Sequence, residues 1–338
     1  MNIISLFSGA GGLDLGMIMA GHEVIWANDH DADAVDTYRK NIGDHIVCGD
    51  IEKIEINSIP DADVVIGGFP CQGFSLANQK REVTDERNIL YKYFKQVIEN
   101  KKPKYFLAEN VRGILSLGGG KVIEKIVKDF EKAGYNVKVK VFNVADFGVP
   151  QTRIRVIIAG TRNDLPPELE YQFPKETHTK KVDESQLKPW VSIGEALGDI
   201  PDPDVFPDAY PNQIYSKYKV TNRNFTGHRT TDPTKPSPTI LARGNGKGGV
   251  CAIQHPENLR RMSVRESASV QTFPLNFEFT GAMNSCYRQV GNAVPVLFAK
   301  CLGLQLRLLE PIIFQDCKKV ESDLQKTKKK LRKEKVCA

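Results

Sequence analysis

The stretch IISLFSGAGG, residues 3–12, joins a short apolar run to a glycine-rich turn. Such a run is typical of a buried strand, and the segment beginning near Leu13 is typical of the helix that follows it. Glycines at a strand-to-helix turn let a ligand approach the backbone, and Asp29 ends the next apolar run, where an acid would bind ribose hydroxyls. The stretch predicts an α/β fold with a nucleoside site, for either a dinucleotide or a methyl-donating adenosine compound. Without its neighbours, the turn would indicate only a tight bend.

The same alternation of short apolar runs and longer amphipathic segments continues along the chain, which is typical of a doubly wound, mostly parallel sheet. It predicts strands over residues 3–7, 23–27, 64–66, 105–108 and 137–142, and an added strand over 155–159. It predicts helices over residues 89–100, 121–133 and 294–309. From residue 163 to residue 260 Pro, Gly, Asn and Thr dominate, which indicates an irregular second region.

The length of 338 residues exceeds the usual size of one core, so we expect a large domain and a smaller one. We divide the chain into a catalytic and cofactor-binding domain (1–163), a smaller irregular domain (164–275), a segment that returns to the first domain (276–312) and a basic tail (313–338). Seven scattered cysteines without CxxC or metal-ligand spacing indicate reduced thiols and no metal. No export signal or membrane-spanning run is evident, which favours a cytoplasmic protein.

The net charge of +6 is located in the tail, where residues 318–338 carry nine Lys or Arg against three Asp or Glu. Within the formally neutral remainder, residues 216–265 carry ten basic side chains against two acidic ones. A local basic excess can contact nucleic-acid phosphates, so the irregular region is the candidate nucleic-acid surface. The tail would add non-specific attraction to DNA at low salt.

One thiol stands just past a predicted strand, in the stretch GGFPCQGFS of residues 67–75. A free cysteine is most often a small buried apolar group. Cys71, however, lies where open α/β sheets bind their ligands, and a thiolate is a good nucleophile. Pro70 fixes the backbone before it, and glycines at 67, 68 and 73 would leave space for a flat substrate. We therefore interpret Cys71 as a candidate nucleophile.

Two further clusters are candidates for the same site. Glu109 ends the apolar run YFLA of residues 105–108, where it is a candidate general acid, although the start of a helix is an equal alternative. In QTRIR, residues 151–155, Arg153 and Arg155 are two positions apart and lie on the same side of an extended segment. Paired guanidinium groups would bind an anion or a base edge, with surface salt bridges as the ordinary alternative.

In this order, the motifs resemble those of the DNA (cytosine-5) methyltransferases of prokaryotic restriction-modification systems, over nearly all of residues 1–305. LFSGAGG is similar to the family's cofactor loop, GFPCQ to its nucleophile, ENV to its acid and QTRIR to its arginine motif. RESASVQTFP, residues 265–274, is similar to its late motif, and GNAVP, residues 291–295, to the returning helix that completes the cofactor site.

The resemblance implies a Rossmann-like domain that binds S-adenosylmethionine and releases S-adenosylhomocysteine, with residues 164–258 as the core of a target-recognition domain. It implies that a cytosine is flipped out of duplex DNA and that Cys71 adds to its carbon 6. Glu109 would protonate or hydrogen-bond ring nitrogen 3, so that carbon 5 accepts the methyl group. The remaining catalytic residues would position the base, hold the acid and its loop, and support the activated ring: Pro70, Asn110, Arg153 and Arg155.

The resemblance also implies a set of cofactor residues: Phe7, Ser8, Gly9, Ala10, Gly11, Gly12, Asp29, His30, Asp50, Ile51, Leu90, Asn292, Ala293 and Val294. Among them, Asp29 would take the ribose hydroxyls and Asp50 would read the adenine amino group. His30 stands where the family often has a larger aromatic side chain, so we expect weaker stacking on adenine.

The DNA-binding residues that the resemblance implies are Gln72, Ser75, Thr239, Arg243 and Lys247. The polar stretch 75–88 resembles the family's mobile loop that closes over DNA. Thr239 would fix a phosphate, and Arg243 or Lys247 would contact guanine or phosphate, although each of the two fits a solvated surface loop as well. The expected partners are double-stranded DNA and a separately acting restriction endonuclease, with the enzyme a monomer.

Two alternative functions remain from the sequence. Methylation of transfer RNA uses the same chemistry, but the cysteine-containing insert of that branch is not seen here. A binding protein that kept the fold and lost catalysis is disfavoured by intact Cys71, Glu109, Arg153 and cofactor loop.

Overall fold

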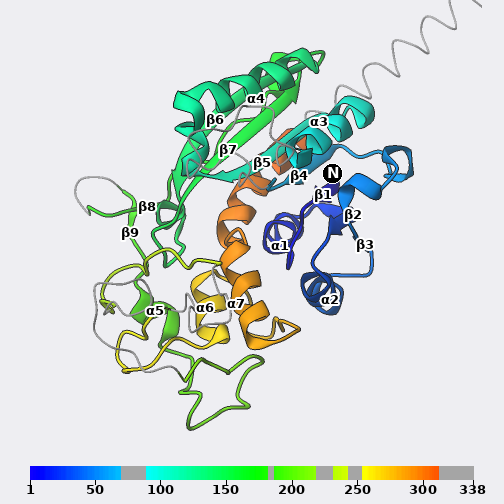
Figure 1. The fold of residues 1–338 in the computed structure, drawn as a ribbon. Coiled ribbons are helices and arrows are strands. Elements are labelled where there is room, and N and C mark those ends of the chain that lie inside the picture. Colours follow the sequence, from blue (N-terminus) through cyan, green and yellow to red (C-terminus); the bar gives the residue numbers. More distant parts are fainter. Residues whose placement is uncertain (70–88, 182–185, 218–230, 243–252, 312–338) are drawn as a thin grey trace, which may run out of the picture.

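A computed structural model describes residues 1–69, 89–181, 186–217, 231–242 and 253–311 of the chain. Its centre is a seven-stranded sheet in the order β3-β2-β1-β4-β5-β7-β6 (Figure 1). The strands are β1 (Asn2–Leu6), β2 (Glu23–Asp29), β3 (Ile46–Cys48), β4 (Val64–Gly67), β5 (Tyr105–Val111), β6 (Tyr135–Asn143) and β7 (Ile154–Arg162). β7 is antiparallel to both of its neighbours, and the other pairs are parallel. The predicted doubly wound, mostly parallel sheet is confirmed, and its strand order reverses between β1 and β4, where such sheets bind ligands.

Helices cover both faces of this sheet. The α-helices are α1 (Gly12–Met19), α2 (Ala32–Asn41), α3 (Ile89–Lys101), α4 (Lys121–Lys132), α5 (Ile193–Leu197), α6 (Val264–Val270) and α7 (Met283–Asn292), followed by helical residues 296–311. Short 3₁₀ turns and a two-stranded ladder complete the described elements: η1 (Ile51–Lys53), η2 (Ile56–Ser58), η5 (Arg112–Leu115), η6 (Leu117–Gly120), η7 (Val144–Phe147), η8 (Pro167–Leu169), β8 (His178–Thr179) and β9 (Lys188–Pro189).

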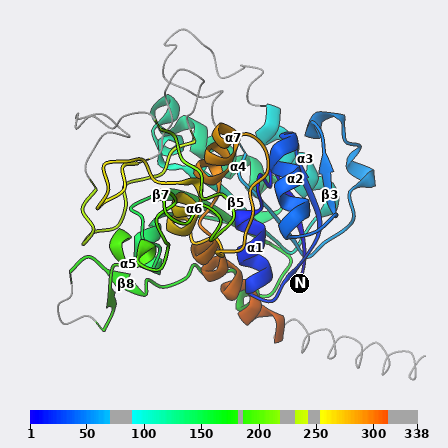
Figure 2. The ribbon, with the colours of Figure 1, turned by 90° about the horizontal axis from the view of Figure 1, so that it is seen from below.

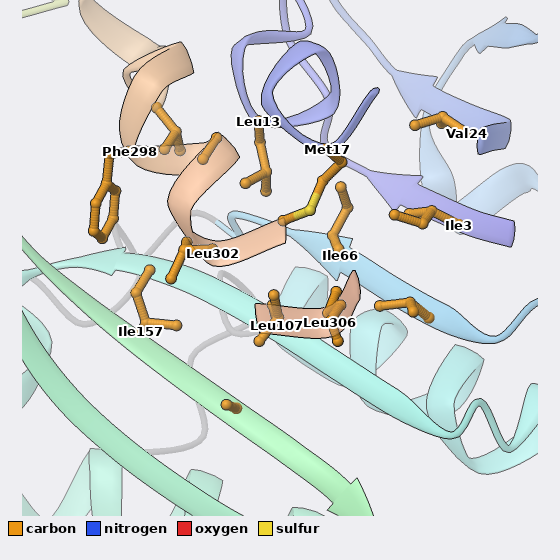
Figure 3. Packing of buried hydrophobic residues seen from close by; sticks show 14 of the residues in the cluster. Ile3, Leu13, Met17, Val24, Ile66, Leu107, Ile157, Phe298, Leu302 and Leu306 are labelled. Carbon is orange, nitrogen blue, oxygen red and sulfur yellow. The ribbon is translucent and has the colours of Figure 1, made fainter. Parts of the chain in front are cut away.

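Two apolar cores lie against the sheet, one on each face. On the first face, α1, α2 and helix 296–311 bury their apolar side chains with residues of the strands. Figure 3 shows Phe298, Leu302 and Leu306 of the last helix lying against the strands that carry Ile66, Leu107 and Ile157. On the second face, α3 and α4 enclose an aromatic group that contains Phe94, Phe106 and Phe130. One face of the sheet is therefore covered in part by a helix from the far end of the chain.

The sequence pattern missed the helices α2 and α7 and the short strand β3. β3 has three residues and lies at the sheet edge with Val47 and Cys48 exposed, so its apolar pattern is weak. The helix expected over 294–309 is confirmed as helical residues 296–311, and α7, which ends at Asn292 just before it, was not predicted. Pro295 has no backbone donor and stands just before the second helix, where proline is tolerated. The intervening turn carries the predicted cofactor residues Ala293 and Val294.

The irregular region packs beside one end of the sheet. Figures 1 and 2 both show α5 on the opposite side of the molecule from β3. A third apolar core joins this region to the sheet half, because it includes Ile240 and Phe273 together with Ala10 of the first turn and Val296 of the last helix. The segment Met283–Pro311, taken as one span, passes a test of length and apolarity for crossing a membrane, but half of its most apolar window is buried within the protein.

Candidate active site

The first turn of the sheet leaves open space on one side. Phe7 and Gly9 have φ values of +57° and +54°, which bend the backbone sharply as it leaves β1. A methyl group at Gly9 would meet nothing within 4 Å, whereas one at Gly12 would lie 2.5 Å from the carbonyl oxygen of Val294. Gly12 thus admits the turn after α7, and Gly9 leaves the backbone accessible to a ligand.

Asp29, at the end of β2, holds this turn in place. Its Oδ2 accepts a hydrogen bond from the backbone N–H of Gly9 at 2.7 Å, and its Oδ1 accepts one from Asp31 at 2.9 Å. His30 is 78% exposed in its side chain, and its Nδ1 lies 3.5 Å from Asp29 Oδ1. Because each carboxylate oxygen can accept about two hydrogen bonds, Asp29 retains acceptor capacity for a ribose hydroxyl.

Several of the predicted cofactor residues converge although they come from distant segments. Phe7, Ile51 and Leu90 all pack on the second apolar core. Ala293 and Val294 lie against Gly12, while Asp50 and Asn292 are exposed beside these segments in the chain. Ser8 and Ala10 face inward instead: the Ser8 hydroxyl donates to Ser5 Oγ at 2.9 Å, and Ala10 joins the third core.

Behind the turn lies a buried carboxyl that the sequence analysis did not single out. Asp14 on α1 is fully buried, and its two oxygens accept hydrogen bonds from Ser5 Oγ at 2.7 Å and Tyr38 Oη at 2.9 Å. Tyr38 Oη is also 3.0 Å from His45 Nε2. Burial raises the pKa of Asp14 to about 6 in spite of these hydrogen bonds. The available signal was an acid between two leucines on a helix that begins at the first turn.

Glu109 lies in β5 next to the segment that leads to Cys71. Its Oε1 forms an ion pair with Arg155 Nε at 2.6 Å, with only 13% of the Glu109 side chain and 10% of the Arg155 side chain exposed. A methyl group at Gly68 would lie 3.1 Å from Glu109 Oε2, and one at Gly67 would collide with the carbonyl oxygen of Leu6. These two glycines therefore make room for Glu109 and for β1, which corrects the expectation that they leave space for substrate.

Asn110, the next residue, ties β5 to the end of the described segment before Pro70. Its Nδ2 donates to the Phe69 carbonyl at 2.9 Å, and its Oδ1 accepts from the backbone N–H of Val111. Asn110 thus links β5 to the residue that precedes Pro70. The predicted residues Pro70, Cys71, Gln72, Ser75, Arg243 and Lys247 lie outside the described residues.

Arg153 binds backbone carbonyls, whereas Arg155 forms an ion pair with Glu109. Its side chain is buried, Nη1 donates to the carbonyl of Ile240 at 2.9 Å, and Nη2 donates to the carbonyls of Gly291 and Ala293 at 2.9 and 3.1 Å. Burial, followed by the charge of Arg155, lowers the pKa of Arg153 to about 9. The expectation that both arginines support the base therefore applies, as a proposal, to Arg155, since both terminal nitrogens of Arg153 are occupied.

Thr239 is likewise engaged with protein. Its hydroxyl donates to the Thr152 carbonyl at 2.7 Å, so the proton that a phosphate would need is already in use. Thr239 anchors its segment to the arginine motif, and the expected phosphate contact stays a prediction. Among the described residues, no group of three or more His, Cys, Asp or Glu side chains is arranged to hold a metal ion.

Comparison with known proteins gives a consistent result. Residues 1–307 match the family model for C-5 cytosine-specific DNA methylases. The chain is 42% identical over 320 residues to the Type II methyltransferase M.NgoFVII of Neisseria gonorrhoeae, covering 87% of this chain and 83% of that protein. It is 38% identical over 348 residues to the Type II methyltransferase M.BspRI of Lysinibacillus sphaericus, covering 89% and 80%.

Solved structures share the fold. A putative DNA modification methyltransferase of an E. coli prophage superposes with a TM-score of 0.70 at 23% identity, covering 92% of this chain and 99% of that one. The S. pombe Dnmt2 methyltransferase superposes with a TM-score of 0.67 at 20% identity, covering 92% and 99%.

Proposed function

Because this chain belongs to the C-5 cytosine-specific DNA methylase family, we propose that the residues assembled at the carboxyl ends of its strands carry out the family's reaction. The protein is a DNA cytosine-5 methyltransferase of the restriction-modification type, and it depends on S-adenosylmethionine. The proposal concerns which side chain has which role.

Cys71 is the proposed nucleophile and Glu109 the proposed acid. The Cys71 thiolate forms a bond to carbon 6 of a flipped cytosine while Glu109 gives or shares a proton at ring nitrogen 3, which makes carbon 5 nucleophilic. After carbon 5 has gained a methyl group, loss of its proton and cleavage of the bond to sulfur restore the aromatic ring and the free thiol. Arg155 holds the Glu109 carboxyl through the 2.6 Å ion pair, and Asn110 holds the segment before Cys71.

The first turn fits S-adenosylmethionine, which supplies an electrophilic methyl group on a sulfonium and leaves as S-adenosylhomocysteine. The fit depends on the open space at Gly9 and on the carboxylate of Asp29, which keeps acceptor capacity for ribose. Phe7, Ile51 and Leu90 would supply apolar contacts, because they share the second core. His30, with its exposed ring, would lie over adenine.

One observation carries the assignment of roles. The Glu109 carboxyl is buried beside Gly68, three residues before Cys71, and it is fixed there by Arg155. An acid of this kind, held beside Gly68, matches the need for a proton at ring nitrogen 3, which is conjugated through carbons 4 and 5 with carbon 6, the atom that the thiolate attacks. Neither a transport nor a simple binding role requires this pairing.

Bisulfite sequencing of plasmid DNA incubated with protein and S-adenosylmethionine tests the proposal. Wild type should methylate cytosines in one short motif, and Cys71→Ala should lose methylation while it still binds S-adenosylhomocysteine. Cys48→Ala is the matched control, because Cys48 is an exposed thiol at the end of β3 and should be dispensable. A duplex with 5-fluorocytosine at the target should trap wild type covalently, since fluorine blocks the final proton loss. Turnover by Cys71→Ala would refute the assigned nucleophile.

We further propose that the enzyme acts as a monomer in a prokaryotic cytoplasm, beside a restriction endonuclease that binds DNA separately. The support is the restriction-modification type of its curated relatives. The protein expressed without the genes that neighbour its own, and then purified, should still methylate DNA. A requirement for a second subunit would contradict the proposed monomer.

A further inference from the structure

Arg153 joins two regions that the proposed function assigns to different ligands. The carbonyl that Nη1 binds belongs to Ile240, three residues before Arg243, in the segment that leads into the proposed DNA-reading stretch. The two carbonyls that Nη2 binds belong to Gly291 and Ala293, on either side of the cofactor residue Asn292. A single buried side chain therefore spans from the recognition segment to the cofactor turn.

A second buried link runs parallel to the first. The backbone N–H of Ile240 donates to Gln151 Oε1 at 3.0 Å, and Gln151 Nε2 donates to Gln271 Oε1 at 2.9 Å. Gln271 Nε2 then donates to the carbonyls of Val290 and Ala293 at 2.7 and 3.3 Å. Both glutamines are fully buried. The N–H and the C=O of the same residue, Ile240, are thus each connected to the turn after α7.

Direct packing adds a third contact between the same two segments. A methyl group at Gly291 would lie 2.5 Å from the backbone of Leu241 and Ala242, so only glycine allows this approach. Because the contacts are buried and hydrogen-bonded at both ends, a shift of the recognition segment would leave polar groups unpaired unless the cofactor turn moved with it.

Arg265, another buried arginine, differs from Arg153 in where its hydrogen-bond acceptors lie in the chain. Arg265 is also fully buried and donates to two carbonyls, those of Leu275 and Phe277, at 2.9 and 2.7 Å. Its acceptors lie within twelve residues of it in the chain, whereas those of Arg153 lie 87 to 140 residues away and in two different segments. Arg265 therefore stabilises one loop, and Arg153 connects two.

We propose that Arg153 and the Gln151–Gln271 pair are positioning residues that couple DNA binding to cofactor binding. Each ligand favours the joined arrangement of the Ile240 segment and the turn after α7, so each raises the affinity for the other, reciprocally. This inference rests on the proposed function of the two segments. It assigns Arg153 to communication between the sites and leaves contact with the base to Arg155.

Calorimetric titration of S-adenosylhomocysteine into the full chain tests the coupling. It is done with and without a duplex that carries the motif found by bisulfite sequencing. In wild type the duplex should tighten cofactor binding by about 5-fold or more, which is the usual lower range of such couplings. Arg153→Met and Gln271→Met should bring that ratio close to one, and Arg153→Lys, which keeps the charge, should give an intermediate ratio. Gln271→Met and Arg153→Lys keep the test available if Arg153→Met does not fold.

Arg265→Met is the matched control, because it removes a buried arginine of similar hydrogen bonding without touching either link. It should lower the thermal midpoint and leave the ratio unchanged. An equal loss of the ratio in Arg265→Met, an unchanged ratio in Arg153→Met, or a wild-type ratio of one would overturn the inference. If wild type did not bind S-adenosylhomocysteine at all, the proposed cofactor site would be overturned as well. That result differs from binding with an affinity ratio of one, so failure of the coupling and failure of the proposed function can be told apart.

Discussion

The sheet half and the irregular half of this molecule are held together by different means. In the sheet half, strands pair their own backbone groups, and apolar clusters on both faces supply the stability. In the irregular half, buried arginines and capping side chains pair the backbone instead: Arg265 binds two carbonyls, and Ser192 and Ser263 each start a helix with a reciprocal capping box.

This difference follows from what a buried backbone requires. Each buried N–H and C=O needs a partner, and a region whose described strands are only the short pair β8 and β9 must obtain many of its partners from side chains. Arginine offers five donors on one side chain, so it can satisfy several carbonyls at once. Loops fixed at a few such points can vary between them, which suits the target recognition that we propose for this region.

The largest effect should come from the aromatic cluster of the sheet half. Phe106→Ala removes a fully buried ring that packs on Phe94 and Phe130, and should lower the free energy of unfolding by about 3–5 kcal/mol. Urea unfolding followed by fluorescence measures this. Leu308→Ala, at an exposed position on the last helix, is the control and should change little. A loss below about 1 kcal/mol for Phe106→Ala would contradict the view that apolar burial dominates this half.

Asp14 tests whether the sheet half tolerates a buried acid whose hydrogen-bond donors, Ser5 and Tyr38, carry no charge. Because burial raises its pKa to about 6 from 3.8, the folded protein binds this proton more tightly than the unfolded chain. Stability should therefore fall as the pH rises from about 4 to about 6 and stay level above that, by on the order of 3 kcal/mol. Unfolding titrations across this range should show a steeper fall for wild type than for Asp14→Asn. Parallel curves would rule the effect out.

Arg265 tests the irregular half directly. Arg265→Met leaves the carbonyls of Leu275 and Phe277 without their donor, but it also removes a buried charge, so we expect a net loss of about 2 kcal/mol. Differential scanning calorimetry is the measurement. As a comparison, Arg288→Met breaks a half-exposed pair with Asp31 and should cost at most about 1 kcal/mol. If the two variants were equally mild, the buried arginine would not be what holds the irregular half.

The smallest effect should come from one hydrogen bond between the halves. Thr239→Val keeps the shape of the side chain and removes the hydroxyl that binds the Thr152 carbonyl, which should lower stability by about 0.5–1.5 kcal/mol. The urea midpoint reports the change, and Thr234→Val, whose hydroxyl binds the neighbouring Asp232 in an exposed turn, provides the control. A larger loss than that for Arg265→Met would reverse the order of importance proposed here.

The same division explains what could be predicted from the sequence. Local patterns predict most strands of the sheet half and the position of Asp29 at the end of β2, because an apolar run and the residue after it are neighbours in the chain. Glu109, expected just after its strand, lies within β5, which continues to Val111. β3 was not predicted, because three residues are too few to show the alternation of apolar and polar side chains that marks a strand. The partners of Arg153 were not predicted for a different reason. Ile240 and Gly291 are far from Arg153 in the sequence, so no local pattern of residues connects them to it.

In the proposed cofactor site, local spacing predicts one part and tertiary packing supplies another. Its glycine turn and Asp29 follow from spacing, and the structure adds their hydrogen bond. The Asp14 network behind it combines Ser5, Tyr38 and His45, none of which has a distinctive neighbour in the chain. Polar partners brought together by tertiary packing leave no periodic trace in the sequence, so they were visible only in three dimensions.

The last helix has a consequence for how the chain is made. Phe298, Leu302 and Leu306 cover one face of a sheet whose strands all lie before residue 163. During synthesis the strands leave the ribosome well before the last helix does. The part of this apolar face that the last helix covers therefore stays exposed to solvent while more than a hundred residues are added. Contacts at such separations in sequence form slowly. A nascent chain of this protein is thus a natural client for chaperones until its final helix arrives.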